Sequence, residues 1–303
     1  MTADEKQRDG DARGSASPDD RSRRDFVAKS AAFGMAASTA SIPAAGLDVL
    51  EKNVEIITRD GSCDAVFIHP ATGAYPGVLI WTDIFGLRPA FRAMGRRLAT
   101  AGYAVLVPNP FYRTARAPIF DNASSFNFQS ESDRAKLPPL TGPLAVPGAT
   151  ESDAQAYIGF LDRQPQVNTK KKMGTQGYCW GGPQMLRTAA AVPDRIGAGA
   201  SFHGGGLVTD KPDSPHLLAP KIRARMYFAI ASNDDQRQPE AKDKLREAFA
   251  AAKVPAEIEV YAGAQHGWCV PDMPEHDGKP LYDKPAAERA WSKLLALYRV
   301  ALA

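Results

Sequence analysis

Cysteine is scarce in this chain, and its scarcity excludes two classes of protein. The 303 residues include three cysteines, Cys63, Cys179 and Cys269. Three cysteines form at most one disulfide, so the chain is not a disulfide-stapled scaffold. None of them stands in a C-x-x-C spacing, so the sequence indicates neither a cysteine zinc site nor a dithiol redox site.

The chain also lacks a strong excess of charge of one sign. It holds 37 Lys and Arg against 34 Asp and Glu, a formal net charge of +3, and it has no polybasic tract. Nucleic acid is therefore not an expected partner. Of the residues, 44% are hydrophobic and 23% are charged, which is typical of a soluble globular protein. Beyond residue 45 no stretch approaches the roughly 18 apolar residues of a membrane span, so none is expected in the mature protein.

Residues 1–45 are expected to lie outside the fold. A polar stretch leads to the pair Arg23-Arg24, which has a phenylalanine and a lysine close behind it, and a small-residue apolar run then extends over 30–45. This order resembles the export signal of the twin-arginine (Tat) pathway, which carries folded proteins across the bacterial inner membrane. The resemblance implies the Tat machinery as a partner and a periplasmic or secreted mature protein that begins near Gly46. The alternative is a disordered arm with a chance arginine pair.

Short apolar runs alternate with amphipathic segments over 46–303. This alternation is typical of βα units around a largely parallel sheet, so the expected fold class is α/β in one domain. The predicted strands are 54–58, 63–69, 77–81, 103–107, 172–177, 196–202, 225–231 and 256–261. The predicted helices are 89–101, 152–161, 183–191, 240–252 and 288–302.

The periodicity fails between residues 108 and 148. This stretch contains seven prolines, several Ser and Asn, and five aromatic residues. A loop of this length in a compact domain is usually a lid or a binding loop, and we expect one here. A surface excursion without function is the alternative.

The segment 177–182, Gly-Tyr-Cys-Trp-Gly-Gly, stands where a predicted strand meets a predicted helix. Its spacing is that of a nucleophile elbow, in which a strained turn between glycines exposes the nucleophile, here Cys179. The start of the helix stabilises a thiolate and points the backbone N–H of Trp180 toward a developing oxyanion. The alternatives are a buried structural cysteine and a phosphate-binding loop, and the missing Gly-Lys-Ser/Thr weakens the second.

A cysteine nucleophile needs a base, and the base needs a carboxylate to orient it. Asp234 follows the predicted strand 225–231, and His266 lies in a short loop after the last predicted strand. The chain order of nucleophile, acid and histidine is the order that the α/β-hydrolase architecture requires. Asp235 is the rival acid, but its spacing from the strand end is less favourable. We therefore predict a triad of Cys179, His266 and Asp234.

Four segments together resemble the dienelactone hydrolase family: the elbow, Asn-Asp at 233–234, Ala-Gln-His-Gly at 264–267 and Trp-Thr-Asp-Ile-Phe-Gly at 81–86. The resemblance covers the chain from about residue 54 to the end and implies an eight-stranded α/β-hydrolase domain without a cofactor. In that family a glutamate holds the resting thiol, and the matching residue here is the shorter Asp83. The second oxyanion donor implied by the resemblance is the backbone N–H of Ile84.

Members of the family that act on dienelactone bind the substrate carboxylate with arginines, one of them shortly after the histidine. Here His266 is followed by Gly-Trp-Cys-Val-Pro, with no arginine. Dienelactone itself is therefore not the expected substrate. Arg113, Arg116 and Arg134, in the stretch 108–148, are candidates for contacting an acidic ligand.

His203 begins the sequence His-Gly-Gly-Gly, which matches the oxyanion motif of lipases in its letters. That motif precedes the nucleophile in lipases, whereas this one follows it. We interpret it as a loop after a strand, from which His203 can face the cleft.

These observations predict an exported hydrolase that opens a small ester or lactone by acyl transfer to Cys179, with no cofactor. His266 acts as base and then as acid, Asp234 orients it, and the amides of Trp180 and Ile84 hold the oxyanion. A thioesterase or broad carboxylesterase on the same triad is the nearest alternative. The others are a ligand-binding homologue without catalysis and a thiol sensor that joins Cys179 to Cys269.

Overall fold

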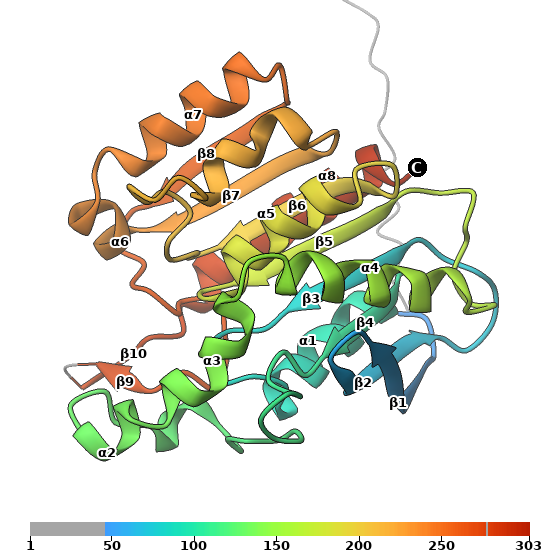
Figure 1. Cartoon of the computed structure of the whole chain (residues 1–303), viewed down its shortest axis with the longest axis horizontal. Coiled ribbons are helices and arrows are strands. Elements are labelled where there is room, and N and C mark those ends of the chain that lie inside the picture. The colour runs from blue at the N-terminus through green and yellow to red at the C-terminus, as the bar shows by residue number, and fades with distance from the viewer. Residues whose placement is uncertain (1–45, 277) are drawn as a thin grey trace, which may run out of the picture. The chain divides into compact units, whose positions relative to one another are not determined.

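An eight-stranded sheet runs through the described part of the computed structural model, residues 46–276 and 278–303 (Figure 1). The export signal expected at 1–45 lies outside the described residues and stays a prediction. The strand order is β1-β2-β4-β3-β5-β6-β7-β8. The strands are β1 Val49–Thr58, β2 Gly61–Pro70, β3 Gly77–Trp81, β4 Ala104–Pro108, β5 Met173–Tyr178, β6 Ile196–Phe202, β7 Arg225–Ala231 and β8 Ala256–Tyr261.

The sheet is mostly parallel, as the sequence predicts. Only the β1–β2 and β2–β4 pairings are antiparallel, and the other five are parallel. The carboxyl ends of β3, β5, β6, β7 and β8 therefore share one edge. In parallel α/β sheets this edge carries the ligand site, because the loops after several strands meet there.

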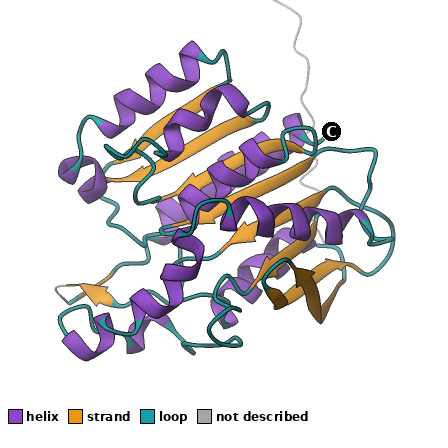
Figure 2. Cartoon of the chain, viewed as in Figure 1, coloured by secondary structure: helices purple, strands orange, loops and turns teal. Residues whose placement is uncertain are grey.

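Helices cover both faces of the sheet (Figure 2). Helices α4, α5 and α7 pack on one face, and α1 and α8 pack on the other. The helices are α1 Pro89–Thr100, α2 Glu131–Arg134, α3 Leu137–Ala145, α4 Ala149–Asp162, α5 Gly181–Ala191, α6 Ser232–Arg237, α7 Ala241–Ala251 and α8 Lys284–Ala301. Shorter elements are the turns of 3-10 helix η1 Ala123–Ser125 and η2 Pro215–Lys221 and the hairpin of β9 Glu275–His276 and β10 Lys279–Pro280.

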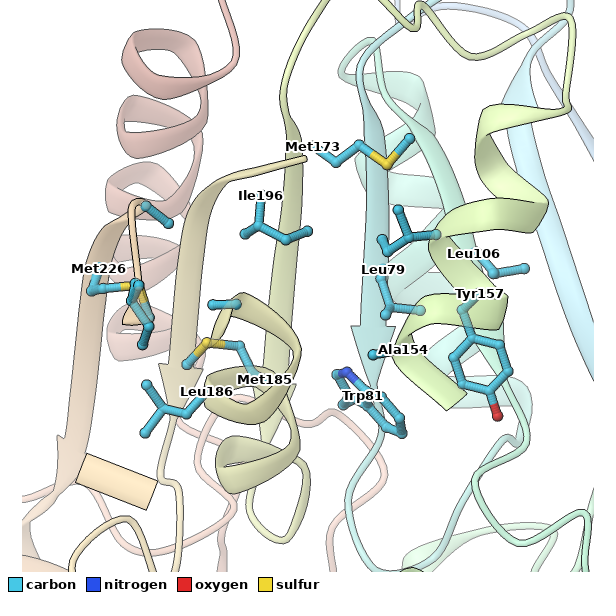
Figure 3. Packing of buried hydrophobic residues seen from close by; sticks show 14 of the residues in the cluster. Leu79, Trp81, Leu106, Ala154, Tyr157, Met173, Met185, Leu186, Ile196 and Met226 are labelled. Carbon is cyan, nitrogen blue, oxygen red and sulfur yellow. The ribbon is translucent and has the colours of Figure 1, made fainter. Parts of the chain in front are cut away.

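The central strand β3 shows why these strands are apolar throughout. Successive side chains of a strand point to opposite faces, so a strand covered on both sides needs apolar residues at every position. Val78 and Ile80 lie in the core under α1 and α8, whereas Leu79 and Trp81 lie in the core under α4 and α5. Figure 3 shows Leu79 and Trp81 in this second core.

The sequence-based strands 77–81, 196–202, 225–231 and 256–261 have the observed bounds, but the loop expected between residues 108 and 148 is not a single loop. It contains η1, α2 and α3. Prolines are tolerated in the first turn of a helix, where α3 has two, and Leu140 and Leu144 lie four residues apart and bury one face. The high proline content therefore misled the prediction.

Over residues 46–276 and 278–303, no helix is both long enough and apolar enough to cross a membrane.

Candidate active site

A cavity of about 640 Å³ lies where the loops after β3, β5, β6, β7 and β8 meet. Five residues singled out from the sequence line it: Asp83, Ile84, Cys179, His203 and His266. The structure thus brings together side chains that lie up to 183 positions apart (266 − 83). Asp234 stands behind His266, where it contacts the histidine ring.

Cys179 occupies a strained turn between β5 and α5. Its φ is 49°, a left-handed value that is uncommon outside glycine, and its backbone N–H donates to the carbonyl of Phe202 at 3.0 Å. The turn leaves no room for side chains on either side of it. A Cβ on Gly177 would stand 2.0 Å from the carbonyl oxygen of Gly181, and one on Gly181 would stand 2.4 Å from the carbonyl oxygen of Thr82. These contacts explain why glycines flank the cysteine in the sequence.

His266 is oriented by two residues of α6. Its Nδ1 lies 2.6 Å from Oδ2 of Asp234, and its backbone N–H donates to Oδ1 of Asn233 at 2.9 Å. Asp235 instead accepts from Lys242 at 2.7 Å. The structure therefore brings Asp234, and not its neighbour, to the histidine. Asp234 lies in the first turn of a short helix rather than in the expected loop, and Asn233 is a partner that the sequence reasoning did not assign.

The ring of His266 lies between two acidic partners. Burial lowers its pKa, but the charge of Cys179 and the hydrogen bond with Asp234 outweigh burial and raise the pKa to about 10. A histidine with this pKa is protonated at neutral pH. It then faces the cysteine sulfur as a cation.

The two residues whose backbone amides are predicted to receive an oxyanion lie close to Cys179 in the fold or the sequence. Ile84 lines the cavity beside Cys179, and Trp180 follows the cysteine at the start of α5. Within the described part of the chain, neither amide hydrogen-bonds another backbone carbonyl outside the regular helices and strands. The indole ring of Trp180 packs on Phe111, with ring centroids 5.3 Å apart. The predicted role of Trp180 thus belongs to its backbone amide and not to its side chain.

Asp83 has a different partner from the one that the family resemblance implies. Both of its oxygens accept from the guanidinium of Arg88, at 2.7 and 2.9 Å, and Oδ1 also accepts from the backbone N–H of Phe85. No hydrogen bond joins Asp83 to Cys179 among the described residues. The family resemblance implies that this carboxylate holds the resting thiol. In the structure both of its oxygens bind Arg88 instead.

Arg88 also binds a second carboxylate. Its Nε and Nη2 donate to Asp272 at 2.7 and 2.8 Å, and Asp272 accepts from the backbone N–H of Ala123. Burial alone lowers the pKa of Arg88, but the two carboxylates outweigh burial and raise it. The sequence reasoning missed this network, because no local pattern joins residues 184 positions apart.

His203 lies against the catalytic candidates without joining them. Its side chain is 1% exposed, it lines the cavity, and its ring meets that of His266 edge to face at 4.9 Å between centroids. Burial and the charge of His266 lower its pKa well below the ordinary value, so the ring is neutral. Neither ring nitrogen has a hydrogen-bond partner within the described residues.

The two other cysteines lie outside this cavity. Cys63 is buried with its sulfur 3.3 Å from the hydroxyl of Tyr157, and Cys269 lines a separate cavity of about 170 Å³ beside α1 and α8. Burial raises the pKa of both thiols, in Cys63 to about 12 and in Cys269 well above the ordinary value. All three cysteines are free. These features do not favour a sensor built on Cys179 and Cys269.

None of the three candidate arginines lines the cavity. Arg113 is bound by Asp60 and Asp153, and Arg116 pairs with Glu55 on the surface. Arg134 donates to the carbonyl of Phe128. The expectation that they contact an acidic ligand is therefore not supported.

Comparison with known proteins places the chain in a family. Residues 63–302 match the sequence model of the Dienelactone hydrolase family. The chain belongs to this family. A carboxymethylenebutenolidase of Rhodococcus opacus is 28% identical over 213 residues, which cover 69% of this chain and 77% of the relative. A protein of Methylorubrum extorquens, whose name assigns it provisionally to the same activity, is 28% identical over 304 residues, covering 96% of this chain and 97% of its own.

Solved structures agree on the fold of this dienelactone hydrolase family member. A dienelactone hydrolase-like promiscuous phosphotriesterase from metagenomic libraries superposes with a TM-score of 0.68 at 23% identity, covering 84% of this chain and 99% of its own. A dienelactone hydrolase of Anabaena variabilis gives a TM-score of 0.56 at 17% identity over the same shares. The predicted α/β-hydrolase fold is thereby confirmed, and the family makes the chain a hydrolase of ester or lactone bonds.

The elbow predicts the effect of adding a single methyl group. We expect Gly177→Ala to destabilise the protein by about 3 kcal/mol or more, because its Cβ overlaps the Gly181 carbonyl. Gly159→Ala is the control, since that glycine lies within α4 and its Cβ would meet the end of the Arg163 side chain at 3.5 Å, an ordinary contact, and the change should stabilise the helix by about 0.5–1 kcal/mol. Urea unfolding of both variants measures the difference, and equal stabilities would contradict this view of the elbow.

The Arg88 network predicts a large loss of stability when its cation is removed. Arg88→Met leaves Asp83 buried without its partner, and we expect a cost of about 3–5 kcal/mol in urea unfolding. Arg116→Met removes an arginine from an exposed pair and should leave the stability nearly unchanged. A similar loss of unfolding free energy in both variants would show that the Arg88 network does not stabilise the active-site edge of the sheet.

The raised pKa of His266 predicts its titration. Because the folded pKa is about 10 and the ordinary value 6.5, the stability that this charge contributes is complete below about pH 6.5 and is lost as the pH rises through 10. In NMR titrations the His266 ring signal should stay in its protonated position at neutral pH. In Cys179→Ala the pKa should fall, since the strongest contribution that raises it is gone. His266→Gln assigns the signal, and a wild-type midpoint near 6.5 would refute the ion pair.

Proposed function

We propose that this chain is an exported hydrolase that cleaves a small ester or lactone through a Cys179-His266-Asp234 triad and a cysteine acyl-enzyme. The observation that carries the proposal is the position of His266, which lies against both Cys179 and Asp234 in a cavity at the carboxyl edge of the sheet. The family and the name of its Rhodococcus opacus member support a lactone or ester as the bond that is cleaved.

The first half of the reaction forms the acyl-enzyme. The Cys179 thiolate attacks the carbonyl carbon, and the carbonyl oxygen becomes an oxyanion between the amides of Ile84 and Trp180. The tetrahedral intermediate collapses and expels an alkoxide, which takes the proton of the His266 imidazolium. In a lactone the alcohol stays attached to the acyl group. Asp234 keeps the ring oriented by its bond to Nδ1.

The second half restores the enzyme. His266, now neutral, takes a proton from water as the oxygen of that water attacks the thioester carbon. Collapse of the second intermediate expels the Cys179 thiolate and releases the acid. The thiolate again faces a protonated His266, so one water is consumed and no other reactant is required. In this scheme Asp83 transfers no proton, because Arg88 binds both of its oxygens.

The nearest alternative is a thioesterase or broad carboxylesterase on the same residues, which would differ in the leaving group alone. A ligand-binding homologue without catalysis is less consistent with the site. Binding alone requires neither the strained φ of Cys179 nor the close contact of His266 with Asp234.

Export through the Tat pathway is the second part of the proposal, and it rests on the sequence of residues 1–45. The activity does not depend on it, since the site lies within residues 46–303.

Removal of the nucleophile tests the proposal directly. The chain from residue 46 onward should hydrolyse 4-nitrophenyl acetate, and Cys179→Ala should lower this rate to that of the buffer. Cys63→Ala is the matched control, because that thiol lies outside the cavity, and it should retain the activity. Stopped-flow spectra give the rates, and mass spectrometry detects the acylated cysteine. Equal rates in the wild type and in Cys179→Ala would refute the hydrolase mechanism.

A further inference from the structure

The cavity beside Cys179 has an aromatic wall that the catalytic proposal does not use. Phe85 follows β3, and Phe126 and Phe128 come from the segment between η1 and α2. Their ring centroids lie 5.3 Å apart for Phe85 and Phe126 and 4.7 Å apart for Phe126 and Phe128, with the rings edge to face. Such a cluster offers ring faces and edges to a further aromatic ring.

This wall remains open to a ligand. Phe128 is 46% exposed although its ring is large and apolar. A fourth ring, Phe120, packs behind Phe85 and Phe126 at 5.7 Å from each. The outer ring thus packs on other aromatic rings and stays partly exposed at the cavity lining, where a substrate ring can cover it.

Apart from His266, whose charge is paired with Asp234, the charged residues that line the cavity are acidic. Asp83 and Glu275 line it, and no lysine or arginine does so within the described residues. The buried cation behind Asp83, Arg88, is matched by two carboxylates. An anionic substrate group would lose its water here without gaining a counter-ion, which is a costly exchange.

The remaining polar groups of the cavity are uncharged. His203 is neutral and has two ring nitrogens without partners in the described structure. Asn127, Gln129 and Gln265 also line the cavity. These groups can hydrogen-bond a neutral polar atom of a substrate, but they cannot balance a full negative charge.

We propose that the cavity selects uncharged aromatic esters and lactones, with the acyl ring against Phe85, Phe126 and Phe128, and that it disfavours substrates with a carboxylate on the acyl group. This inference rests on the hydrolytic function proposed above and names its substrate class.

Three trifluoroethyl esters test the selection, because their small leaving group cannot occupy the aromatic wall. They are the esters of phenylacetic acid, of cyclohexylacetic acid and of para-carboxyphenylacetic acid. We expect kcat/KM for the phenylacetate to exceed that for the cyclohexylacetate about threefold to tenfold. It should exceed that for the para-carboxy ester by about tenfold or more. Acid release in a pH-stat measures all three.

Two variants assign the preferences to their residues. Glu275→Gln should raise the ratio of kcat/KM for the para-carboxy ester to kcat/KM for the phenylacetate about tenfold. Glu131→Gln, on α2 outside the cavity lining, is its control. Phe128→Leu should bring the phenylacetate and the cyclohexylacetate to similar values, and since Phe128 is partly exposed the variant should fold. Phe160→Leu, on α4, is the matched control.

The outcomes separate this inference from the proposed function. Hydrolysis of all three esters at similar kcat/KM would overturn the selection and leave the hydrolase standing. If no ester is hydrolysed, the hydrolytic function fails. Calorimetric binding of the esters to Cys179→Ala then tests whether the cavity selects an uncharged ring. Tighter binding of the phenylacetate than of the para-carboxy ester would support the selection, whereas equal binding or none would overturn it.

Discussion

The geometry of the active-site edge depends on one buried cation, the guanidinium of Arg88. It binds Asp83 in the loop after β3 and Asp272 in the segment after the histidine, and Asp272 in turn binds the backbone of Ala123. Three segments that are far apart in the sequence therefore meet at one charge. The amide of Ile84 follows Asp83 directly, so the proposed oxyanion site is positioned by the same ion pair.

This ion pair changes how the proposed nucleophile can be controlled. A carboxylate whose two oxygens are both bound by an arginine is not free to hold a thiol, so the sulfur of Cys179 faces His266 instead. The histidine is held by Asp234 and carries the proton at neutral pH. In the proposed mechanism, binding of a substrate therefore need not release the cysteine from Asp83.

The features that local spacing determines could be predicted from the sequence. An apolar run marks each buried strand, a glycine pair marks the elbow at Cys179, and the residues just after each parallel strand must share one edge. Asp234 and His266 follow from the same rule. The partner of Asp83 could not be predicted, because Asp272 lies 184 positions from Arg88 and ion pairs at that separation leave no local pattern. The helix α3 was missed because prolines are usual in loops, and two of its three prolines are compatible with a helix only because they lie in the first turn.

The polarity of the cavity follows from the same long-range contacts. A site for an anionic substrate needs a cation whose charge is not already balanced, and the sequence offers several arginines near the site. The fold pairs each of Arg88, Arg113 and Arg116 with a carboxylate, while Glu275 stays on the cavity lining. What remains for a substrate is aromatic surface and neutral hydrogen-bonding groups. Composition alone cannot reveal this, since it counts charges but not their partners. A net charge of +3 coexists here with a cavity whose charged side chains, apart from His266, are acidic.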